Sequence, residues 1–487
     1  MSIQKQFESA RLAGVPLLAI SSPDPMATMK SLLAVEQDNT PFLAWDCMRG
    51  LWSLNDAGKP YQAAELVGKP IAILAGKADE LPDGCVICLL GVASYFDEPA
   101  VLQGIWNLRD TYKSSQRTMV LLGQSIKLPQ ELQNDVILFD EPLPTTADLA
   151  AIVDDIDEQA SMNNDRPRMD KTVREKAIAA VQGLSAFVAE QAVAMNVTEE
   201  GIDLDSLWEA KRELIEQTPG LSVYRGTETF DSIRGLNSLK VDMRELIDGR
   251  EPIDGVVFVD EIEKMLAGSG SGGDSSGVSQ GILQCLLTHL QDTAASGIIL
   301  IGPPGVGKSM IAKAVGNEAK APTIAFDTNA MKGSLVGQSE QMARTAFKTI
   351  GAVTNGHAFW IATCNKIADL PPELRRRFRL GTYFVDLPTK EERAAIWDYY
   401  KGKYKIKDKI DFGDDGWTGA EIESCCYMAW RKKKTLKAAS TRIVPISIAA
   451  RDRVEGLRKE FDGKYLSASY DGMFTLGLRT TARKIRV

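Results

Sequence analysis

The sequence predicts an α/β protein with two parallel sheets, each covered by helices, and a helical segment at the end of the chain. Short continuous apolar runs alternate with helical patterns, as expected for strands buried in a parallel sheet. One of these runs leads through a glycine-rich loop into a helix. The first part of the chain also repeats the second part in weakened form, which indicates a duplicated domain. A chain of 487 residues with 44% hydrophobic content suits two to four such domains.

The glycine-rich loop, GPPGVGKS, follows the apolar run IILI and precedes a helix-forming stretch. This is the strand, loop and helix context of a phosphate cradle, in which glycines let backbone N–H groups and a helix N-terminus approach the anion. Lys308 would contact the β and γ phosphates, and Ser309 would offer its hydroxyl to Mg²⁺. The residues predicted to bind nucleotide here are Gly302, Pro303, Pro304, Gly305, Val306, Gly307, Lys308, Ser309 and Met310.

Two carboxylates end the apolar run VVFVDE at residues 256–261. Asp260 is the candidate ligand of Mg²⁺, together with Ser309, and Glu261 is placed to orient and deprotonate the attacking water. Asn365 ends the later strand HAFWIATCN and is suitably polar to position that water or the γ phosphate. The cofactors predicted from these residues are ATP and Mg²⁺.

The acidic strand comes before the glycine-rich loop, which reverses the usual chain order of these motifs. Downstream of the loop, only the six residues 351–356 separate a helical pattern from the strand at residues 357–365. A strand with its return helix needs far more, because a crossover alone takes at least about a dozen residues. The segment 255–292 supplies a strand and a helix at another place in the chain. We therefore predict one nucleotide site on a circularly permuted, five-stranded parallel sheet.

Over residues 229–469 these motifs resemble those of the AAA+ ATPases. SIRGLNSLK resembles the family's adenine-side segment and implies base contacts from Ile233 and Gly235. GWTGAEIES resembles the start of the family's helical lid, where Gly419 and Ala420 would leave room for the adenosine. The sequences of these motifs are similar to those of the plastid and cyanobacterial AAA proteins with an inactive ATPase-like N-terminal domain. The resemblance implies a P-loop AAA+ core followed by a helical lid.

The segment LPPELRRRF resembles the part of the family that carries arginine fingers. By this resemblance Arg377 would reach the γ phosphate bound by the neighbouring subunit of a homo-oligomer, a hexamer in the family. A second finger usually follows three residues later, where this chain has Leu380, and Arg379 is then the candidate replacement. The alternative is that these arginines form a solvated basic face.

Two loops have alternative interpretations. KGSLVGQSE resembles the family's pore-loop stretch, but Leu335 stands where motors that pull polypeptide usually have an aromatic residue, so an ordinary surface loop remains open. The segment GSGSGGDSSG at residues 268–277 has the composition of a flexible linker. Its position after the acidic strand favours a mobile loop at the active site.

The N-terminal part has the pattern of an ATPase-like domain without its phosphate site. QSIKLPQEL followed by VILFDE parallels NKIADLPPEL followed by TYFVDL, so Asp140 and Glu141 align with the last strand of the core and are expected to be structural. After the first strand, SSPDP replaces the glycine-rich loop and its lysine, and triphosphate cannot be held well there. We expect this domain to serve recognition or ring contacts.

The domain boundaries follow from changes in composition. We expect a degenerate ATPase-like α/β domain over residues 1–150, a helical lid or linker over 151–222, a permuted nucleotide-binding core over 223–388, a helical lid over 389–470 and a C-terminal tail over 471–487.

Charge and composition restrict the partners. A net charge of −8 argues mildly against a dedicated nucleic-acid binder, and the basic helical segment WRKKKTLK is either a solvated surface or a local nucleic-acid contact. Two histidines and seven scattered cysteines form no zinc pattern. No apolar stretch approaches the roughly 20 residues of a membrane-spanning helix, so we expect a cytoplasmic protein with no membrane partner.

These observations favour an Mg²⁺-dependent ATPase that assembles into a ring and remodels a protein or a protein–nucleic acid complex. A nucleotide-switched scaffold with little turnover is the first alternative. A DNA-processing ATPase of the loader kind is the second.

Overall fold

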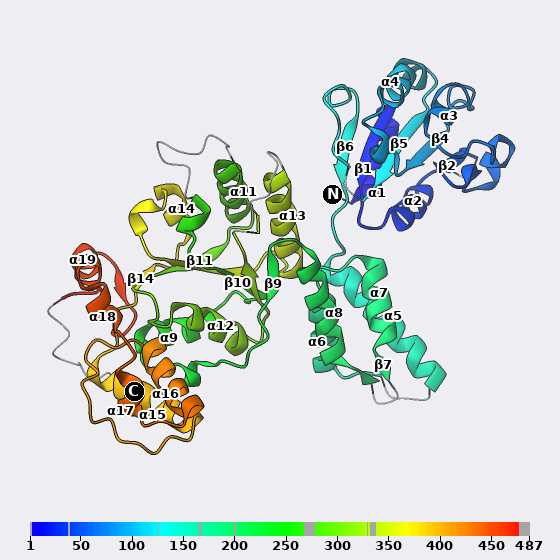
Figure 1. The fold of residues 1–487 in the computed structure, drawn as a ribbon. Coiled ribbons are helices and arrows are strands. Elements are labelled where there is room, and N and C mark those ends of the chain that lie inside the picture. Colours follow the sequence, from blue (N-terminus) through cyan, green and yellow to red (C-terminus); the bar gives the residue numbers. More distant parts are fainter. Residues whose placement is uncertain are drawn as a thin grey trace. The chain divides into compact units, whose positions relative to one another are not determined.

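The structure is a computed structural model that describes residues 2–37, 39–124, 126–164, 168–198, 201–266, 278–328, 330–331 and 338–476. The chain folds as two compact units (Figure 1). Unit 1 comprises Met1–Asp170 and Leu184–Gly201, and unit 2 comprises Lys171–Gly183 and Ile202–Val487. The helical segment after the first sheet is thus shared: α5 (Thr146–Asn164) and α7 (Ala186–Met195) belong to unit 1, and α6 (Lys171–Val181) and α8 (Leu204–Gln217) belong to unit 2.

Unit 1 contains a six-stranded sheet in the order β3-β2-β4-β5-β1-β6. All neighbours pair in parallel except β2 and β3, which form an antiparallel edge pair. The strands are β1 (Leu17–Ser21), β2 (Phe42–Asp46), β3 (Gly50–Ser53), β4 (Val86–Leu90), β5 (Thr118–Gly123) and β6 (Ile137–Asp140). The helices are α1 (Ile3–Leu12), α2 (Pro25–Leu33), α3 (Ile71–Leu74) and α4 (Pro99–Ser114), with 3₁₀ turns at Asp56–Tyr61 and Val92–Tyr95. Separate apolar clusters cover the two faces of this sheet.

The turn between β1 and α2 is where a phosphate loop would lie in an ATPase. Here Asp24 caps α2, and its carboxylate accepts the N–H of Ala27 at 3.1 Å. Thr28 donates to the carboxylate of Glu141, which follows β6, and lies 2.5 Å from the hydroxyl of Ser22. Two carboxylates therefore lie at the helix N-terminus that would otherwise attract a phosphate, and their negative charge opposes triphosphate binding there.

Unit 2 contains a seven-stranded sheet in the order β15-β14-β11-β13-β10-β12-β9. The five strands in the middle are parallel, β15 is a parallel addition at one edge, and β9 is antiparallel at the other. The strands are β9 (Leu221–Val223), β10 (Gly255–Val259), β11 (Ser296–Ile301), β12 (Thr323–Phe326), β13 (Ala358–Cys364), β14 (Thr382–Phe384) and β15 (Leu466–Ser467). The two short edge strands extend the five-stranded sheet predicted from the sequence.

The two sheets share one arrangement of strands but differ in chain order. In unit 1 the parallel strands are ordered β2-β4-β5-β1-β6, and in unit 2 the corresponding order is β12-β10-β13-β11-β14. The strand that is third along the chain in unit 1, β4, therefore corresponds to β10, which precedes the other four in unit 2. By the same comparison β6 is equivalent to β14, as the internal repeat in the sequence predicts.

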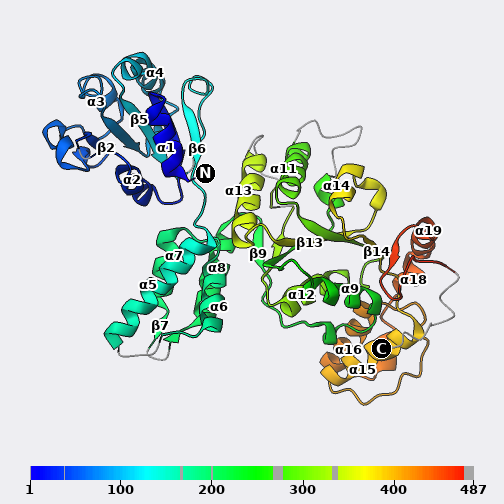
Figure 2. The ribbon, with the colours of Figure 1, turned by 180° about the vertical axis from the view of Figure 1, so that it is seen from behind.

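Helices cover both faces of the second sheet (Figure 2). An apolar cluster on one face includes residues of α11 and α13, and a cluster on the other face includes residues of α9 and α12. The helices of the core are α9 (Asn237–Ile247), α10 (Glu263–Leu266), α11 (Val278–Asp292), α12 (Lys308–Ala319), α13 (Gln338–Val353) and α14 (Pro372–Arg377), with 3₁₀ turns at Phe230–Ser232 and Ile367–Asp369. The sheet is thus buried on both faces, which explains its continuous apolar strands.

A helical lid follows β14. It consists of α15 (Lys390–Lys403), α16 (Gly419–Lys432), α17 (Leu436–Ser440), α18 (Ile446–Ala449) and α19 (Arg451–Phe461). Capping boxes begin α15 at Thr389 and α16 at Thr418, each with a glutamate three residues later. Residues of α15, α16 and α17 share an apolar cluster of their own around Trp397 and Trp417. The lid therefore has its own small core.

Three segments named in the sequence analysis lie wholly or partly outside the described residues: the loop at 268–277, the pore-loop candidate Leu335, and the C-terminal tail beyond residue 476. Among the helices that the structure describes, none is long and apolar enough to cross a membrane.

Candidate active site

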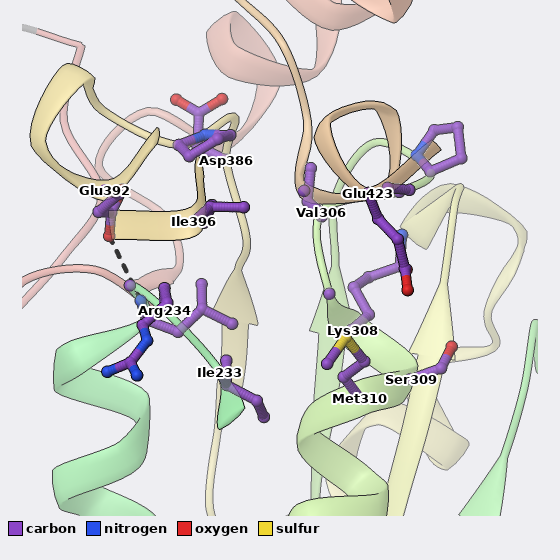
Figure 3. A pocket seen from close by; sticks show the side chains of 18 of the residues that line it. Ile233, Arg234, Val306, Lys308, Ser309, Met310, Asp386, Glu392, Ile396 and Glu423 are labelled. Atoms are coloured by element: carbon purple, nitrogen blue, oxygen red, sulfur yellow. Dashed lines mark hydrogen bonds between the residues drawn. The ribbon is translucent and has the colours of Figure 1, made fainter. Parts of the chain in front are cut away.

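A cavity of about 400 Å³ opens at the carboxyl ends of β10, β11 and β13, beneath the lid (Figure 3). Ligands of open α/β sheets bind at this edge. Apart from Gly302 and Pro303, every residue predicted to bind nucleotide or metal lines the cavity, as do two of the four predicted catalytic residues, Glu261 and Asn365. These lining residues are Ile233, Gly235, Asp260, Glu261, Pro304, Gly305, Val306, Gly307, Lys308, Ser309, Met310, Asn365, Gly419 and Ala420.

The loop between β11 and α12 depends on its glycines. A Cβ on Gly302 would lie 2.0 Å from the carbonyl oxygen of Val385, and one on Gly305 would lie 3.0 Å from the Thr418 hydroxyl. Gly305 and Gly307 have φ of +81° and +99°, which L-residues rarely adopt. The lid contacts this loop directly, because the N–H of Ala420 donates to the carbonyl of Gly305 at 3.2 Å. The loop is therefore a compact cradle closed on one side by the lid.

Lys308 is the buried cation of the cavity, with 8% of its surface exposed. Its ammonium donates to the carbonyls of Gly302 at 2.7 Å and Pro303 at 2.8 Å, and lies 3.5 Å from the amide oxygen of Asn365. Burial lowers the pKa of Lys308 to about 8, although the nearby Asp260 carboxylate opposes that shift. An anion bound in the cavity would offset the cost of burying this charge by Coulomb attraction, so the site favours phosphate.

Asp260 and Ser309 are brought together across the sheet. The Ser309 hydroxyl lies 3.5 Å from Oδ1 of Asp260, and the same carboxylate oxygen accepts the hydroxyl hydrogen of Thr363 on β13. Asp260 follows β10 and Ser309 is in the first turn of α12, so two segments far apart in the sequence supply the pair. The result is a carboxylate and a hydroxyl at the mouth of the phosphate cradle.

Glu261 is held in an unusual backbone conformation, with φ of +48°. Its N–H donates to the Thr363 hydroxyl at 2.8 Å, and its side chain accepts the amide of Asn365 at 2.8 Å and forms an ion pair with Lys264. The hydrogen bond from Lys264 lowers the pKa of Glu261, so its carboxylate is ionised at neutral pH. Strained φ angles of this kind persist where the surrounding structure overdetermines them.

The far side of the cavity is formed by the segment Ser232–Leu236 and by α15. Glu392 connects them, because its carboxylate accepts the N–H of Leu236 at 3.3 Å and also the N–H of Thr389 at its own capping box. Ile233 and Ile396 give this side an apolar surface, and Figure 3 shows both on the opposite side of the cavity from Lys308. An apolar slot of this kind suits a flat base better than a phosphate.

Arg377 and Arg379 are not among the residues that line the cavity. Arg377 ends α14, and its guanidinium donates to the side-chain oxygen of Gln291 on α11 at 2.8 Å. Arg379 follows in the turn before β14. The structure therefore brings the other predicted site residues together and leaves the two arginines outside the cavity.

The residues present fit ATP and Mg²⁺. A Cβ at Gly302 would meet the Val385 backbone, so the loop keeps its shape only with glycine at this position, and the cavity contains the buried ammonium of Lys308 for phosphate. Asp260 and Ser309 offer hard oxygen donors, which Mg²⁺ prefers, and Mg²⁺ typically needs only one or two protein ligands beside phosphates and water. Among the described residues no cluster of three or more His, Cys, Asp or Glu forms a dedicated metal cage.

Several lining residues were not identified from the sequence. Thr363 lies inside an apolar strand, although its hydroxyl donates to the Asp260 carboxylate and accepts the backbone N–H of Glu261. Glu392 belongs to a capping-box pattern, which predicts a helix start and gives no sign of its second contact to Leu236. Asp386 lines the cavity and forms an ion pair with Arg458 of α19 at 2.8 Å. The two residues are far apart in the sequence, so no local motif predicts this contact.

Three segments match known families. Residues 298–355 match the ATPase family associated with various cellular activities (AAA). Residues 3–141 match the SpoVK-like AAA ATPase N-terminal domain, and residues 147–218 match the SpoVK-like second domain. The chain belongs to the AAA ATPases. It is therefore an ATPase with SpoVK-like domains ahead of its nucleotide-binding core.

Relatives of this AAA ATPase extend along nearly its whole length. It is 22% identical to the uncharacterized AAA domain-containing protein ycf46 of Guillardia theta, over 94% of each chain. It is 24% identical to the protein of the same name from Gracilaria tenuistipitata, over 72% of this chain and 74% of the relative. The proteasome-activating nucleotidase of Saccharolobus islandicus is 27% identical over 34% of this chain and 56% of its own. Among solved structures, the FIGL-1 AAA domain is similar with a TM-score of 0.32 and 17% identity, over 52% of this chain and 95% of that one.

Proposed function

We propose that this AAA ATPase hydrolyses ATP with Mg²⁺ in a homo-oligomeric ring, a hexamer, and uses the hydrolysis to remodel a protein or a protein–nucleic acid complex. In this proposal each active site is shared by two subunits. The main observation behind this proposal is the position of Arg377, which belongs to the same core as the cavity but does not line the cavity.

The charges around the cavity support a shared site. Lys308 and Arg234 are the cations among the described residues that line it, and Arg234 belongs to the base side, where its guanidinium lies 5.4 Å from the ring centre of Tyr399. A γ phosphate in transfer needs positive charge on more than one side, and an arginine supplied in trans raises turnover by about 10³ to 10⁵. The Arg377 guanidinium donates to a neutral partner, Gln291, so we infer that its charge is available to a neighbouring subunit.

The chain's own residues have distinct roles in the proposed reaction. Mg²⁺, when bound, would polarise the phosphate oxygens, and Asp260 and Ser309 would hold it. Glu261 would accept the proton of the attacking water, and Asn365, which donates to Glu261 at 2.8 Å, would orient that carboxylate. Lys308 would bind the phosphates, and the lid residues Gly419 and Ala420 would close over the nucleotide.

We also infer that the core is a circular permutation of the ordinary AAA arrangement. The inference is supported within the chain itself, since the two sheets have matching strand neighbours and only the second has its third strand first. The N-terminal unit, whose phosphate position is filled by Asp24 and Glu141, would then serve in recruiting clients or in ring contacts.

Complementation between inactive subunits tests the shared site. Arg377→Ala and Lys308→Ala should each lose nearly all turnover. Mixed and reassembled at equal amounts, they should recover activity at sites where an intact Lys308 faces an intact Arg377, about one quarter of all sites for random mixing in a ring. Steady-state phosphate release measures this recovery.

A matched mixture provides the control. Glu261→Gln and Lys308→Ala both damage residues that a subunit supplies to its own site, so no combination of these subunits builds a complete site and no activity should return. Equal recovery in both mixtures, or none in either, contradicts the shared site. Full turnover by Glu261→Gln alone contradicts the assignment of the base.

The proposal also holds that the substrate to be remodelled is a protein. It is supported by similarity to the proteasome-activating nucleotidase and to the ATP-dependent zinc metalloprotease YME1 homolog of Caenorhabditis elegans, the latter 25% identical over 46% of this chain. The Glu261→Gln variant with ATP should stay loaded and retain its client, and mass spectrometry of the trapped material identifies it. Retention that is equal without ATP contradicts remodelling.

One observation favours a nucleotide-switched scaffold as the second candidate. The Glu261 carboxylate forms an ion pair with Lys264, so turnover requires this ion pair to be rearranged. A scaffold would assemble with ATP and turn over little even when Arg377 is present. Measuring turnover per assembled subunit separates the two functions, and stimulation of turnover by DNA would instead favour a loader-type ATPase.

A further inference from the structure

Three aromatic rings meet at the surface where α15 and α16 end. Tyr404 lies 6.0 Å from Tyr427 and 5.8 Å from Trp430, and the last two lie 5.9 Å apart, between ring centres. Trp430 is 51% exposed and Tyr427 is 48% exposed. Tyr404 also packs against the apolar cluster of the lid, but Tyr427 and Trp430 remain open to solvent and are available to stack with a flat ligand.

The rings are surrounded by positive charge. Residues 401–437 contain ten Lys and Arg and six Asp and Glu, although the whole chain carries a net charge of −8. Nine of these cations are exposed: Lys403, Lys405, Lys407, Lys409, Arg431, Lys432, Lys433, Lys434 and Lys437. The loop after α15 lies along the turn between α16 and α17, because Asp408 accepts the N–H of Leu436 and Asp411 pairs with Lys437. We call these three rings and nine cations the aromatic-basic patch.

The six acidic residues of this segment do not neutralise the patch. Asp414 and Asp415 pair with Arg393, and Glu421 accepts the N–H groups of Thr418 and Ile446. Among the described residues, ion pairs join only Lys403 to Glu423 and Lys437 to Asp411. The other seven cations of the patch have no carboxylate partner within the part of the chain that the structure describes.

A purely structural explanation accounts for part of this charge. Lysines in the last turn of a helix stabilise its dipole, and both α15 and α16 end here with basic residues. That effect is confined to the last turn, however, so it does not explain Lys407, Lys409 or the exposure of Trp430.

We propose that the aromatic-basic patch binds single-stranded nucleic acid, with bases stacking on Trp430 and Tyr427 and phosphates contacting the lysines around them. Single strands are bound without sequence preference by this combination of aromatic platforms and cations. A duplex would satisfy only the cations, since its bases are already stacked. The proposal goes beyond the remodelling function and does not depend on it.

The patch is linked to the nucleotide cavity by the two helices that carry it. Lys403 pairs with Glu423, which lines the cavity, and its ammonium lies 5.5 Å from the ring of Tyr400, another lining residue. Occupancy of the patch would therefore bear on the same helices that close over the nucleotide.

Fluorescence anisotropy of the full chain with a labelled oligothymidylate at several salt concentrations tests the proposal. Trp430→Ala should weaken binding about tenfold, because it removes a ring on which a base would stack, and Trp430→Phe should recover most of the affinity. Replacing Arg431, Lys432, Lys433 and Lys434 by Gln should lower the slope of log affinity against log salt by about 2.8, from about 0.7 per phosphate neutralised. Basal ATP turnover should be unchanged in all of these variants.

Matched variants separate the patch from net charge. Replacing Lys5, Lys30, Lys113 and Lys127 by Gln removes the same charge from exposed positions of unit 1 and should leave oligothymidylate binding intact. Equal loss in this variant, unaltered binding by Trp430→Ala, or equal affinity for a duplex of the same length would overturn the proposal. Competition by poly-glutamate at lower concentration than the oligonucleotide would overturn it in favour of an acidic protein partner.

Discussion

Lys308 allows the site to be tested without nucleotide or assembly. Burial lowers the pKa of its ammonium from 10.5 to about 8, so the unfolded chain holds this proton more tightly than the folded chain does. Charged Lys308 therefore destabilises the fold at neutral pH, and the free energy of unfolding rises with pH between the folded and the unfolded pKa. At 1.36 kcal/mol per pKa unit, the gain between pH 7 and pH 10 is about 2.5 kcal/mol.

The variant Lys308→Met isolates this contribution, because it keeps the length of the side chain and removes its titration. Urea unfolding of both proteins, followed by tryptophan fluorescence across this pH range, gives the difference in their unfolding free energies. Groups that titrate alike in both proteins cancel in that difference, which should move in favour of the wild type by about 2.5 kcal/mol. A difference that does not change with pH would mean that the ammonium is solvated in the folded chain, and would refute the reasoning.

Three further predictions concern the contacts around the cavity. Gly302→Ala should abolish ATP binding in equilibrium dialysis, because its Cβ would lie 2.0 Å from the Val385 carbonyl, whereas Gly402→Ala, which meets nothing within 4 Å, should bind normally. Thr363→Val removes the hydroxyl that donates to the Asp260 carboxylate and accepts the Glu261 N–H. It should lower kcat by about 10-fold to 100-fold with little change in ATP affinity, and Thr363→Ser should restore it. Arg458→Ala removes the ion-pair partner of the largely buried Asp386 carboxylate and should cost about 3 kcal/mol in thermal or urea unfolding. Arg451→Ala breaks an exposed ion pair and should cost much less. Equal costs for the two arginines would contradict a buried bridge between lid and core.

The main elements of the fold were predictable because they rest on strong patterns. Continuous apolar runs identify β10, β11 and β13, and the α/β fold with a helical lid is confirmed. The edge strands β9 and β15 were not predicted, since segments of three and two residues carry no periodicity of their own. Their pairing is decided by the exposed edges of a sheet already formed.

The site was predictable to the extent that its chemistry is local in the sequence. The residue types and spacing of the glycines, the lysine and the two carboxylates indicate a phosphate site, and these residues lie around one cavity in the structure. Thr363, Glu392 and Asp386 act through contacts with segments far along the chain, and each has an ordinary local role that conceals the second one. The proposed contribution of Arg377 concerns a second subunit, so neither the sequence nor a single chain decides it.

The position of β10 has a consequence for how this protein is made. The strand leaves the ribosome first among the five, yet it pairs between β12 and β13, and its partners in β13 are more than a hundred residues further on. Until they are synthesised, the stretch GVVFV has no sheet to join, and long-range parallel pairing is slow. During translation this apolar segment is exposed to chance association, so biosynthesis of this chain should be more sensitive to chaperone supply than that of a protein whose central strands emerge consecutively.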